Sequence, residues 1–252
     1  MDYSLGYFCI LIVTGLFAGV INTLAGGGSN LTLPALMLTG MPADIANATN
    51  RVGVFLQCSV GVKGYAQHGK IPTHDLAWIL IPNMVGGVVG AIAAAILPAT
   101  LLKPLLLSAM IGVALVILIF PSVISPPEGT QVQKMKERPS AWIALFFVGI
   151  YGGFVQAGVG FLLITALAGT LRYDMVRSNA LKLVCSLAFT GVALLVFIVD
   201  DLVQWLPGLV LAVGMMAGAG IAVKISLDIS QKTMKWFLLV MTLAASAAAM
   251  FL

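Results

Sequence analysis

The sequence predicts an all-α, polytopic integral membrane protein with two inverted repeats, containing about eight long transmembrane helices plus two short half-helices or re-entrant segments. Composition is the first basis: of 252 residues, 60% are hydrophobic and only 9% are charged, and the mean hydropathy is +1.08. A soluble domain with this composition would have too little polar surface to face water. The second basis is a short phrase that the chain repeats, Ala-Gly-x-Gly followed at equal spacing by Asn-Ala.

The two copies of this phrase lie at one constant offset. The first runs from Ala25 to Gly28 and continues at Asn47, and the second starts at Ala157 and continues at Asn179. Each copy interrupts a hydrophobic stretch with glycine. Paired interruptions at corresponding positions of two halves are the best sequence pointer to the binding site of a secondary transporter.

The apolar runs predict the helices in order. Crossing a hydrocarbon core of about 30 Å takes roughly 20 helical residues. Long helices are expected at 5–24, 44–66, 76–97, 101–121, 140–157, 174–199, 204–223 and 235–252. Shorter pieces follow the glycine phrases at 29–40 and 161–171, and these are expected to be the half-helices.

The long polar stretch divides the chain into a first transmembrane repeat, 1–121, a cytoplasmic connecting loop, 122–139, and a second repeat, 140–252. Counting each short piece as a crossing or return, each half has five segments, so the second half enters the membrane from the opposite side. Such inversion brings the two glycine phrases together near the middle of the bilayer.

Basic residues predict the orientation, because cytoplasmic loops of membrane proteins are enriched in Lys and Arg. The basic residues fall at four successive connections: Lys63 and Lys70; Lys134, Lys136 and Arg138; Arg172 and Arg177; Lys224, Lys232 and Lys235. With these connections inside, the protein is expected in the cell inner (plasma) membrane with both termini non-cytoplasmic. The first helix lacks a basic n-region and is expected to remain as a span.

The glycine phrases are candidate anion sites. A helix that starts after such a break points free backbone N–H groups and its positive dipole end at the break. Glycine also lets a ligand approach the main chain closely. The candidate residues at the breaks are Gly26, Gly27, Gly28 and Ser29, and Gly158, Gly160 and Phe161. Packing of helices is the alternative role for these glycines, as expected for Gly15–Gly19, Gly86–Gly90, Gly149–Gly153 and Gly214–Gly218.

The helices after the half-helices carry polar candidates: Asn47, Asn50, Arg51, Asn179 and Lys182. A lysine within a span is costly and faces a polar cavity or a partner by default. No acidic residue lies at helical spacing from Lys182, so a bound anion is a candidate counter-ion. The alternative is that Lys182 snorkels to the cytoplasmic interface, and Arg51 leaves the same two possibilities open.

Other functional classes find little support. The chain has no HExxH, Walker-type or nucleophile-elbow motif, so no catalytic residue, metal or cofactor is expected. Cys9, Cys58 and Cys185 lack metal-ligand spacing and are expected to be small buried hydrophobes. The expected partners are a small inorganic or organic anion and the lipid bilayer, without nucleic acid. An anion channel, a membrane-embedded enzyme and a homo-oligomer stay open as alternatives.

At these residues the chain resembles the sulfite exporter TauE/SafE family. The segment from Ala18 through Gly28, with 31–36 and 48–50, resembles the first repeat signature of that family, and 149–160 with 177–182 resembles the second. The resemblance covers nearly the whole chain. It implies an inner-membrane carrier that exports small sulfur-containing or organic anions such as sulfite and sulfonates. Ser29 and Arg51 depart from the family pattern, and Arg51 offers a planar fork suited to two oxygens of one anion.

Overall fold

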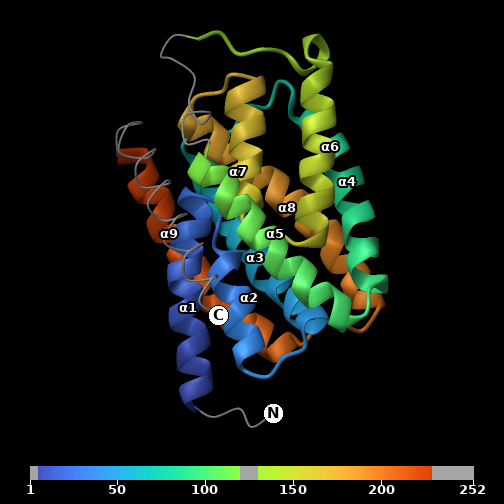
Figure 1. Ribbon diagram of the computed structural model, residues 1–252. Coiled ribbons are helices and arrows are strands. Elements are labelled where there is room, and N and C mark those ends of the chain that lie inside the picture. The colour runs from blue at the N-terminus through green and yellow to red at the C-terminus, as the bar shows by residue number, and fades with distance from the viewer. Residues whose placement is uncertain (1–4, 120–129, 229–252) are drawn as a thin grey trace.

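The computed structural model describes residues 5–119 and 130–228, and within them every regular element is a helix (Figure 1). Short helix η1 (Met135–Glu137) lies in the connecting loop, and η2 (Thr165–Thr170), a π-helix, directly continues α7. The α-helices are α1 (Leu5–Leu24), α2 (Ser29–Leu38), α3 (Ala43–Gln67), α4 (Leu76–Ile96), α5 (Ala99–Ile119), α6 (Pro139–Phe154), α7 (Val159–Ile164), α8 (Met175–Val199) and α9 (Trp205–Asp228).

The helices lie close to the expected ranges, and the short pieces α2 and α7–η2 follow the glycine phrases. By length and hydropathy, four of the described helices can cross a membrane: α1, α4, α8 and α9. The expected count of about eight long spans is therefore reached only in part. Helix α6 has 16 residues, α3 carries Asn47, Asn50 and Arg51, and the expected helix 235–252 lies outside the described residues.

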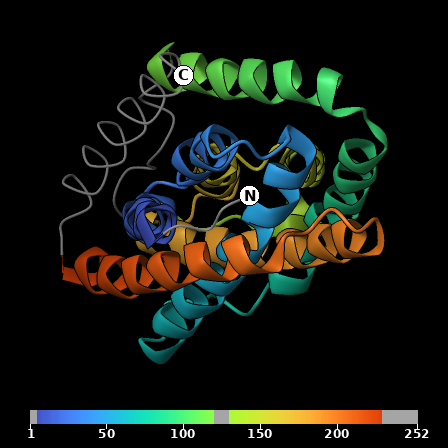
Figure 2. The same cartoon turned by 90° about the horizontal axis from the view of Figure 1, so that it is seen from below.

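Two pairs of helices form the main packing contacts, α1 with α9 and α4 with α6. Helix α1 begins at the lower end of the bundle and α6 at the upper end, so the two helices that lead into the glycine breaks enter from opposite ends (Figure 1). Helices α3 and α8 contact each other, and each also contacts a member of the outer pairs, α9 and α4 respectively. Helix α5 lies along one edge of the bundle and α9 along the opposite edge (Figure 2).

Glycines outside the breaks hold both outer pairs together, as the sequence indicated. A Cβ on any of these glycines would meet backbone atoms of the facing helix, so glycine lets the two backbones approach closely. In α1–α9 they are Gly15, Gly19, Gly214 and Gly218, and in α4–α6 they are Gly86, Gly90, Gly149 and Gly153.

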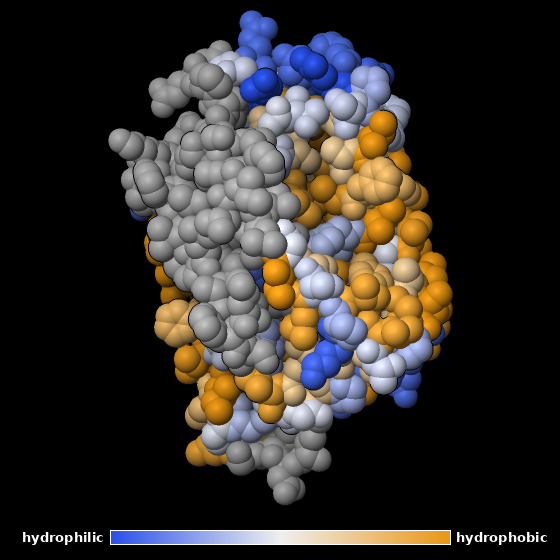
Figure 3. All heavy atoms as spheres, viewed as in Figure 1, coloured by the Kyte–Doolittle hydropathy of each residue, from blue (hydrophilic) through white to orange (hydrophobic). Residues whose placement is uncertain are grey.

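The surface fits a bilayer. Large apolar side chains such as Phe17, Val89, Phe147 and Leu195 are exposed on the long helices. In Figure 3 apolar residues cover much of the described sides of the molecule, whereas hydrophilic residues gather at its upper end. Cys9 belongs to the exposed set, which corrects the expectation that all three cysteines are buried, while Cys58 and Cys185 are buried.

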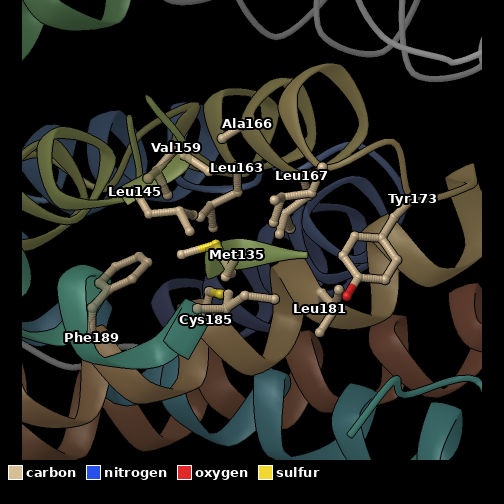
Figure 4. Close-up of a cluster of buried hydrophobic side chains, with 13 residues drawn as sticks. Met135, Leu145, Val159, Leu163, Ala166, Leu167, Tyr173, Leu181, Cys185 and Phe189 are labelled. Atoms are coloured by element: carbon tan, nitrogen blue, oxygen red, sulfur yellow. The ribbon is translucent and has the colours of Figure 1, made fainter. Parts of the chain in front are cut away.

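The described part of the connecting loop is anchored at the upper end of the bundle by Met135. This side chain has no exposed surface and packs into a cluster of apolar side chains that includes Leu163, Leu167 and Cys185 (Figure 4). Its backbone N–H donates to the Asp75 carboxylate at 3.0 Å. Next to it, the Lys136 ammonium lies 5.4 Å from the centre of a Trp78 ring, a cation–π contact. The described part of the loop is therefore packed against the bundle.

We expect Met135→Ala to release this loop. Removing a fully buried methionine side chain costs on the order of 2–5 kcal/mol of stability. Trypsin should then cut rapidly after Lys134 and Lys136, which flank the anchor, and the unfolding temperature should fall. Val132→Ala is the matched control, because Val132 is 39% exposed. Equal cleavage rates in Met135→Ala and in the control would show that the packing of Met135 does not hold the loop.

Candidate functional site

The two glycine breaks cross in direct backbone contact. The Gly160 N–H donates to the Gly26 carbonyl oxygen at 3.2 Å. A Cβ on either residue would collide with the Cα of the other. Gly26 also has φ +88°, a conformation that favours glycine. The end of α1 and the start of α2 therefore meet the end of α6 and the start of α7 at a single point in the interior.

Free donors are concentrated on the first break. The amides of Gly27, Gly28 and Ser29, at the start of α2, have no acceptor among the residues that the structure describes. This is the arrangement that favours an anion at a helix N-terminus. At the second break the amides of Gly160 and Phe161 donate to Gly26 and Gly158 respectively, so they are already engaged.

At the second break the free donors are the amides of Ala157 and Gly158, which likewise lack a described acceptor. Gly158 precedes α7 in the left-handed conformation, with φ 72°. The second break thus adds fewer donors than the first, and they lie just before its half-helix.

Arg51 of α3 is buried against the end of α6. Its Nη1 donates to the Gly152 carbonyl at 2.5 Å and its Nη2 to the Gly153 carbonyl at 2.8 Å. A longer contact of 3.4 Å joins Nη2 to Asn47 Oδ1, and the guanidinium lies 5.5 Å from the centre of the Phe197 ring. Because the C-terminal end of a helix carries partial negative charge, the cation stabilises the end of α6. The Nε atom of Arg51 forms no hydrogen bond with any described residue.

Lys182 of α8 has the same relation to the end of α1. Its Nζ donates to the carbonyls of Asn22 and Thr23, at 2.9 and 2.7 Å, and to Asn179 Oδ1 at 2.9 Å. These bonds use all three of its donors. With 1% of its surface exposed, Lys182 does not snorkel to the interface, which contradicts that alternative. Arg51, with no exposed surface, does not snorkel either.

Each cation therefore stabilises the helix that leads to a glycine break in the other half of the chain. Within the described residues neither cation forms an ion pair with an acidic side chain. Asp75 is the one buried carboxylate among them, and it binds the Met135 amide in the connecting loop. The two cations carry two positive charges, and the two helix ends contribute about half a negative charge each. The crossing therefore keeps a net positive charge.

The asparagines of the predicted site also lie at the crossing, but their polar groups are largely engaged. Asn50 Nδ2 donates to the Ser29 hydroxyl oxygen at 3.0 Å, and Asn50 Oδ1 accepts from the Thr32 hydroxyl at 2.6 Å. Asn47 Nδ2 donates to the Phe154 carbonyl at 2.9 Å. These side chains fix α2 and the end of α6 to α3. The Ser29 hydroxyl oxygen accepts from Asn50, and its own proton has no described acceptor.

The sequence of the chain matches the model of one protein family. The model of the family described as "Sulfite exporter TauE/SafE" matches residues 11–249. The chain belongs to the TauE/SafE family. A probable membrane transporter protein of Haemophilus influenzae is 22% identical over 247 residues, covering 98% of this chain and 96% of that protein. One of Escherichia coli K12 is 27% identical over 246 residues, covering 96% and 89%. One of a Sinorhizobium species is 23% identical, covering 96% and 92%.

In this TauE/SafE protein a second polar network lies beside the first break, and the sequence analysis did not identify it. Gln57 of α3 accepts from Asn22 Nδ2 at 2.5 Å and donates to the Thr23 hydroxyl oxygen at 2.8 Å. On the other side of the crossing, Gln156 Nε2 donates to the Thr190 hydroxyl oxygen at 2.9 Å. The available signal was polar residues, Gln57 and Thr190, deep inside long apolar helices, because such residues are costly in a span and mark functional positions.

Metal chemistry has no residues to support it at the crossing. The described residues contain no group of three or more His, Cys, Asp or Glu side chains placed to hold a metal ion. The groups that do converge there are backbone N–H donors, two cations and neutral amides. This set can bind and neutralise an anion, and it offers no nucleophile paired with a base.

Proposed function

We propose that this membrane transporter is a secondary carrier of small sulfur-containing or organic anions, such as sulfite or sulfonates, with export as its direction. The observation that carries the proposal is the pair of buried cations, Arg51 and Lys182, at the crossing of two broken helices. Neither has a carboxylate partner among the residues that the structure describes. Buried charge requires compensation. The partial charges of the two helix ends compensate part of it, and a bound anion supplies the rest.

In this proposal the anion is bound at the start of α2. The free amides of Gly27, Gly28 and Ser29 and the Ser29 hydroxyl donate to its oxygens, and the amide of Gly158 approaches from the second break. Arg51 and Lys182 act through their charge, since their hydrogen bonds go largely to helix ends. Asn47, Asn50 and Asn179 position these groups, and Gly26, Gly160 and Phe161 form the contact between the breaks.

Two inverted repeats and alternating access around this contact complete the proposal. Support comes from the pairing of helices: α1 packs on α9 as α6 packs on α4, and α3 packs on α9 as α8 packs on α4. If the corresponding helices of the two halves are interchanged, the α1–α9 pair becomes the α6–α4 pair and the α3–α9 pair becomes the α8–α4 pair. The site residues are all buried, so substrate must enter and leave through movement of one half against the other.

The orientation is also part of the proposal. The loop with Lys134, Lys136 and Arg138 is placed in the cytoplasm, and α1 starts on the non-cytoplasmic side of the inner membrane. The repeats correspond to 1–121 and 140–252. An inside-negative membrane potential then favours anion exit by about 2.3 kcal/mol per charge per 100 mV, so export needs no dedicated proton relay.

Uptake of radiolabelled sulfite and methanesulfonate into liposomes containing the purified protein tests the function. Saturable uptake, faster when the receiving side is positive, is expected for the wild type. Lys182→Met keeps an unbranched side chain, one atom shorter, but removes its charge, and we expect at least a tenfold lower rate in the folded variant. Ser59→Ala is the control, because the Ser59 hydroxyl bonds only to Phe55 in its own helix. Uptake no faster than in empty liposomes, for both anions, would contradict the proposal.

A further inference from the structure

Asn30 stands out at the first break because its side chain is buried and has no partner. It is the second residue of α2 and is 2% exposed. Among the described residues, none forms a hydrogen bond with its carboxamide, and its Oδ1 is fully enclosed. A buried polar group without a partner costs roughly 1–3 kcal/mol, and most native proteins avoid it. The neighbours Ser29 and Thr32, by contrast, are both bonded to Asn50.

The carboxamide of Asn30 lies against the glycine break. Its Nδ2 is 3.8 Å from the position that a Cβ on Gly27 would occupy. The free amides of Gly27, Gly28 and Ser29 start the same helix turn. The amide group of Asn30 thus lies beside three unpaired backbone donors and within the field of the helix N-terminus.

We propose that Asn30 is a substrate-binding residue that donates its side-chain N–H to an oxygen of the anion. The inference rests on the proposed function and adds to it the group that recognises the substrate. An anion with several oxygens on one atom, such as a sulfite, sulfonate or carboxylate group, accepts from the backbone amides and from Asn30 together. A spherical halide has no separate oxygens to satisfy these donors.

The second break does not repeat this arrangement. At the constant offset Phe161 replaces Ser29 and Leu162 replaces Asn30. Phe161 packs in an apolar cluster with Ile21, Leu24 and Ala25, which are the last turn of α1 and the start of the first break. The side chains that donate to the oxyanion group, Ser29 and Asn30, therefore come from the first half of the chain.

The test compares stability and transport in Asn30→Ala. Because Asn30 has no partner to lose, the variant should unfold at the wild-type temperature, whereas Asn50→Ala, which loses two hydrogen bonds, should unfold at a lower temperature. Loss of one hydrogen bond to a charged group predicts a KM for sulfite and methanesulfonate about 10- to 100-fold higher in Asn30→Ala. Asn30→Ser, which keeps a donor, should recover part of the affinity. Asn30→Asp should abolish uptake by repulsion.

The outcomes separate this inference from the proposed function. Wild-type uptake together with an unchanged KM in Asn30→Ala would overturn the role of Asn30 and leave the carrier intact. A fall in the unfolding temperature of Asn30→Ala as large as that of Asn50→Ala would also overturn it, since the side chain would then be structural. Absence of anion uptake in the wild type would instead contradict the proposed function itself.

Discussion

Arg51→Met should cause a large loss of stability at the crossing. The variant leaves the carbonyls of Gly152 and Gly153 without their charged partner in a buried position. An unsatisfied buried acceptor costs about 1–3 kcal/mol, so we expect a loss on the order of 3 kcal/mol together with the lost helix-end stabilisation. Thermal unfolding of the detergent-solubilised protein measures it.

Arg51→Lys provides the matched comparison. A lysine keeps the charge but not the planar fork that reaches both carbonyls, so part of the stability should return. If Arg51→Met unfolds at the wild-type temperature, Arg51 does not stabilise the end of α6. If a folded Arg51→Met variant takes up anions at the wild-type rate, the charge of Arg51 does not contribute to the anion site.

Gly160→Ala should abolish transport. Its new methyl group would collide with the Cα of Gly26, which is backbone and cannot move aside as a side chain can. The breaks would have to separate, and the hydrogen bond from Gly160 to Gly26 would be lost. Overpacking of this kind costs typically 1–3 kcal/mol. We expect a lower unfolding temperature and uptake below a tenth of the wild-type rate.

Gly220→Ala is the control for this experiment, because a Cβ at Gly220 has no atom of a described residue within 4 Å. It should transport normally and, as a helical glycine replaced by alanine, should be slightly more stable. Gly27→Ala provides a second comparison for folding alone, since its Cβ would make only ordinary contacts at 3.8 and 3.9 Å. Normal uptake by Gly160→Ala would show that close contact of the breaks is not needed.

Much of the fold could be predicted because it depends on local sequence. Long apolar runs predicted the helices, and the glycine phrases marked the two interruptions where α2 and α7 begin. Small residues spaced four apart, such as Gly15 and Gly19, predicted the close helix pairs. The π-helical turn of η2 was not anticipated, because its backbone pattern has no simple sequence signature.

The partners of the polar side chains could not be predicted, because they come from elements far apart in the sequence. At the constant offset of the two glycine phrases, Asn50 falls at the position of Lys182, so an amide and a cation occupy equivalent places in the sequence. In the structure Arg51, one residue later, matches Lys182 at the end of the opposite helix, while Asn50 binds Ser29 and Thr32. A helix turns about 100° per residue, so neighbouring side chains point toward different helices: Asn50 faces α2 and Arg51 faces the end of α6. The burial of Met135 depends equally on distant helices.

We propose that an anion binds where the two breaks cross and that the protein alternates around it. Counterflow in liposomes tests this most directly. Vesicles containing the wild-type protein are loaded with unlabelled sulfite and diluted into a trace of labelled sulfite at zero membrane potential. A carrier predicts transient accumulation of label above the outside concentration, absent in Gly160→Ala and normal in Gly220→Ala. Simple equilibration of label without accumulation, or accumulation that Gly160→Ala leaves unchanged, would contradict the account.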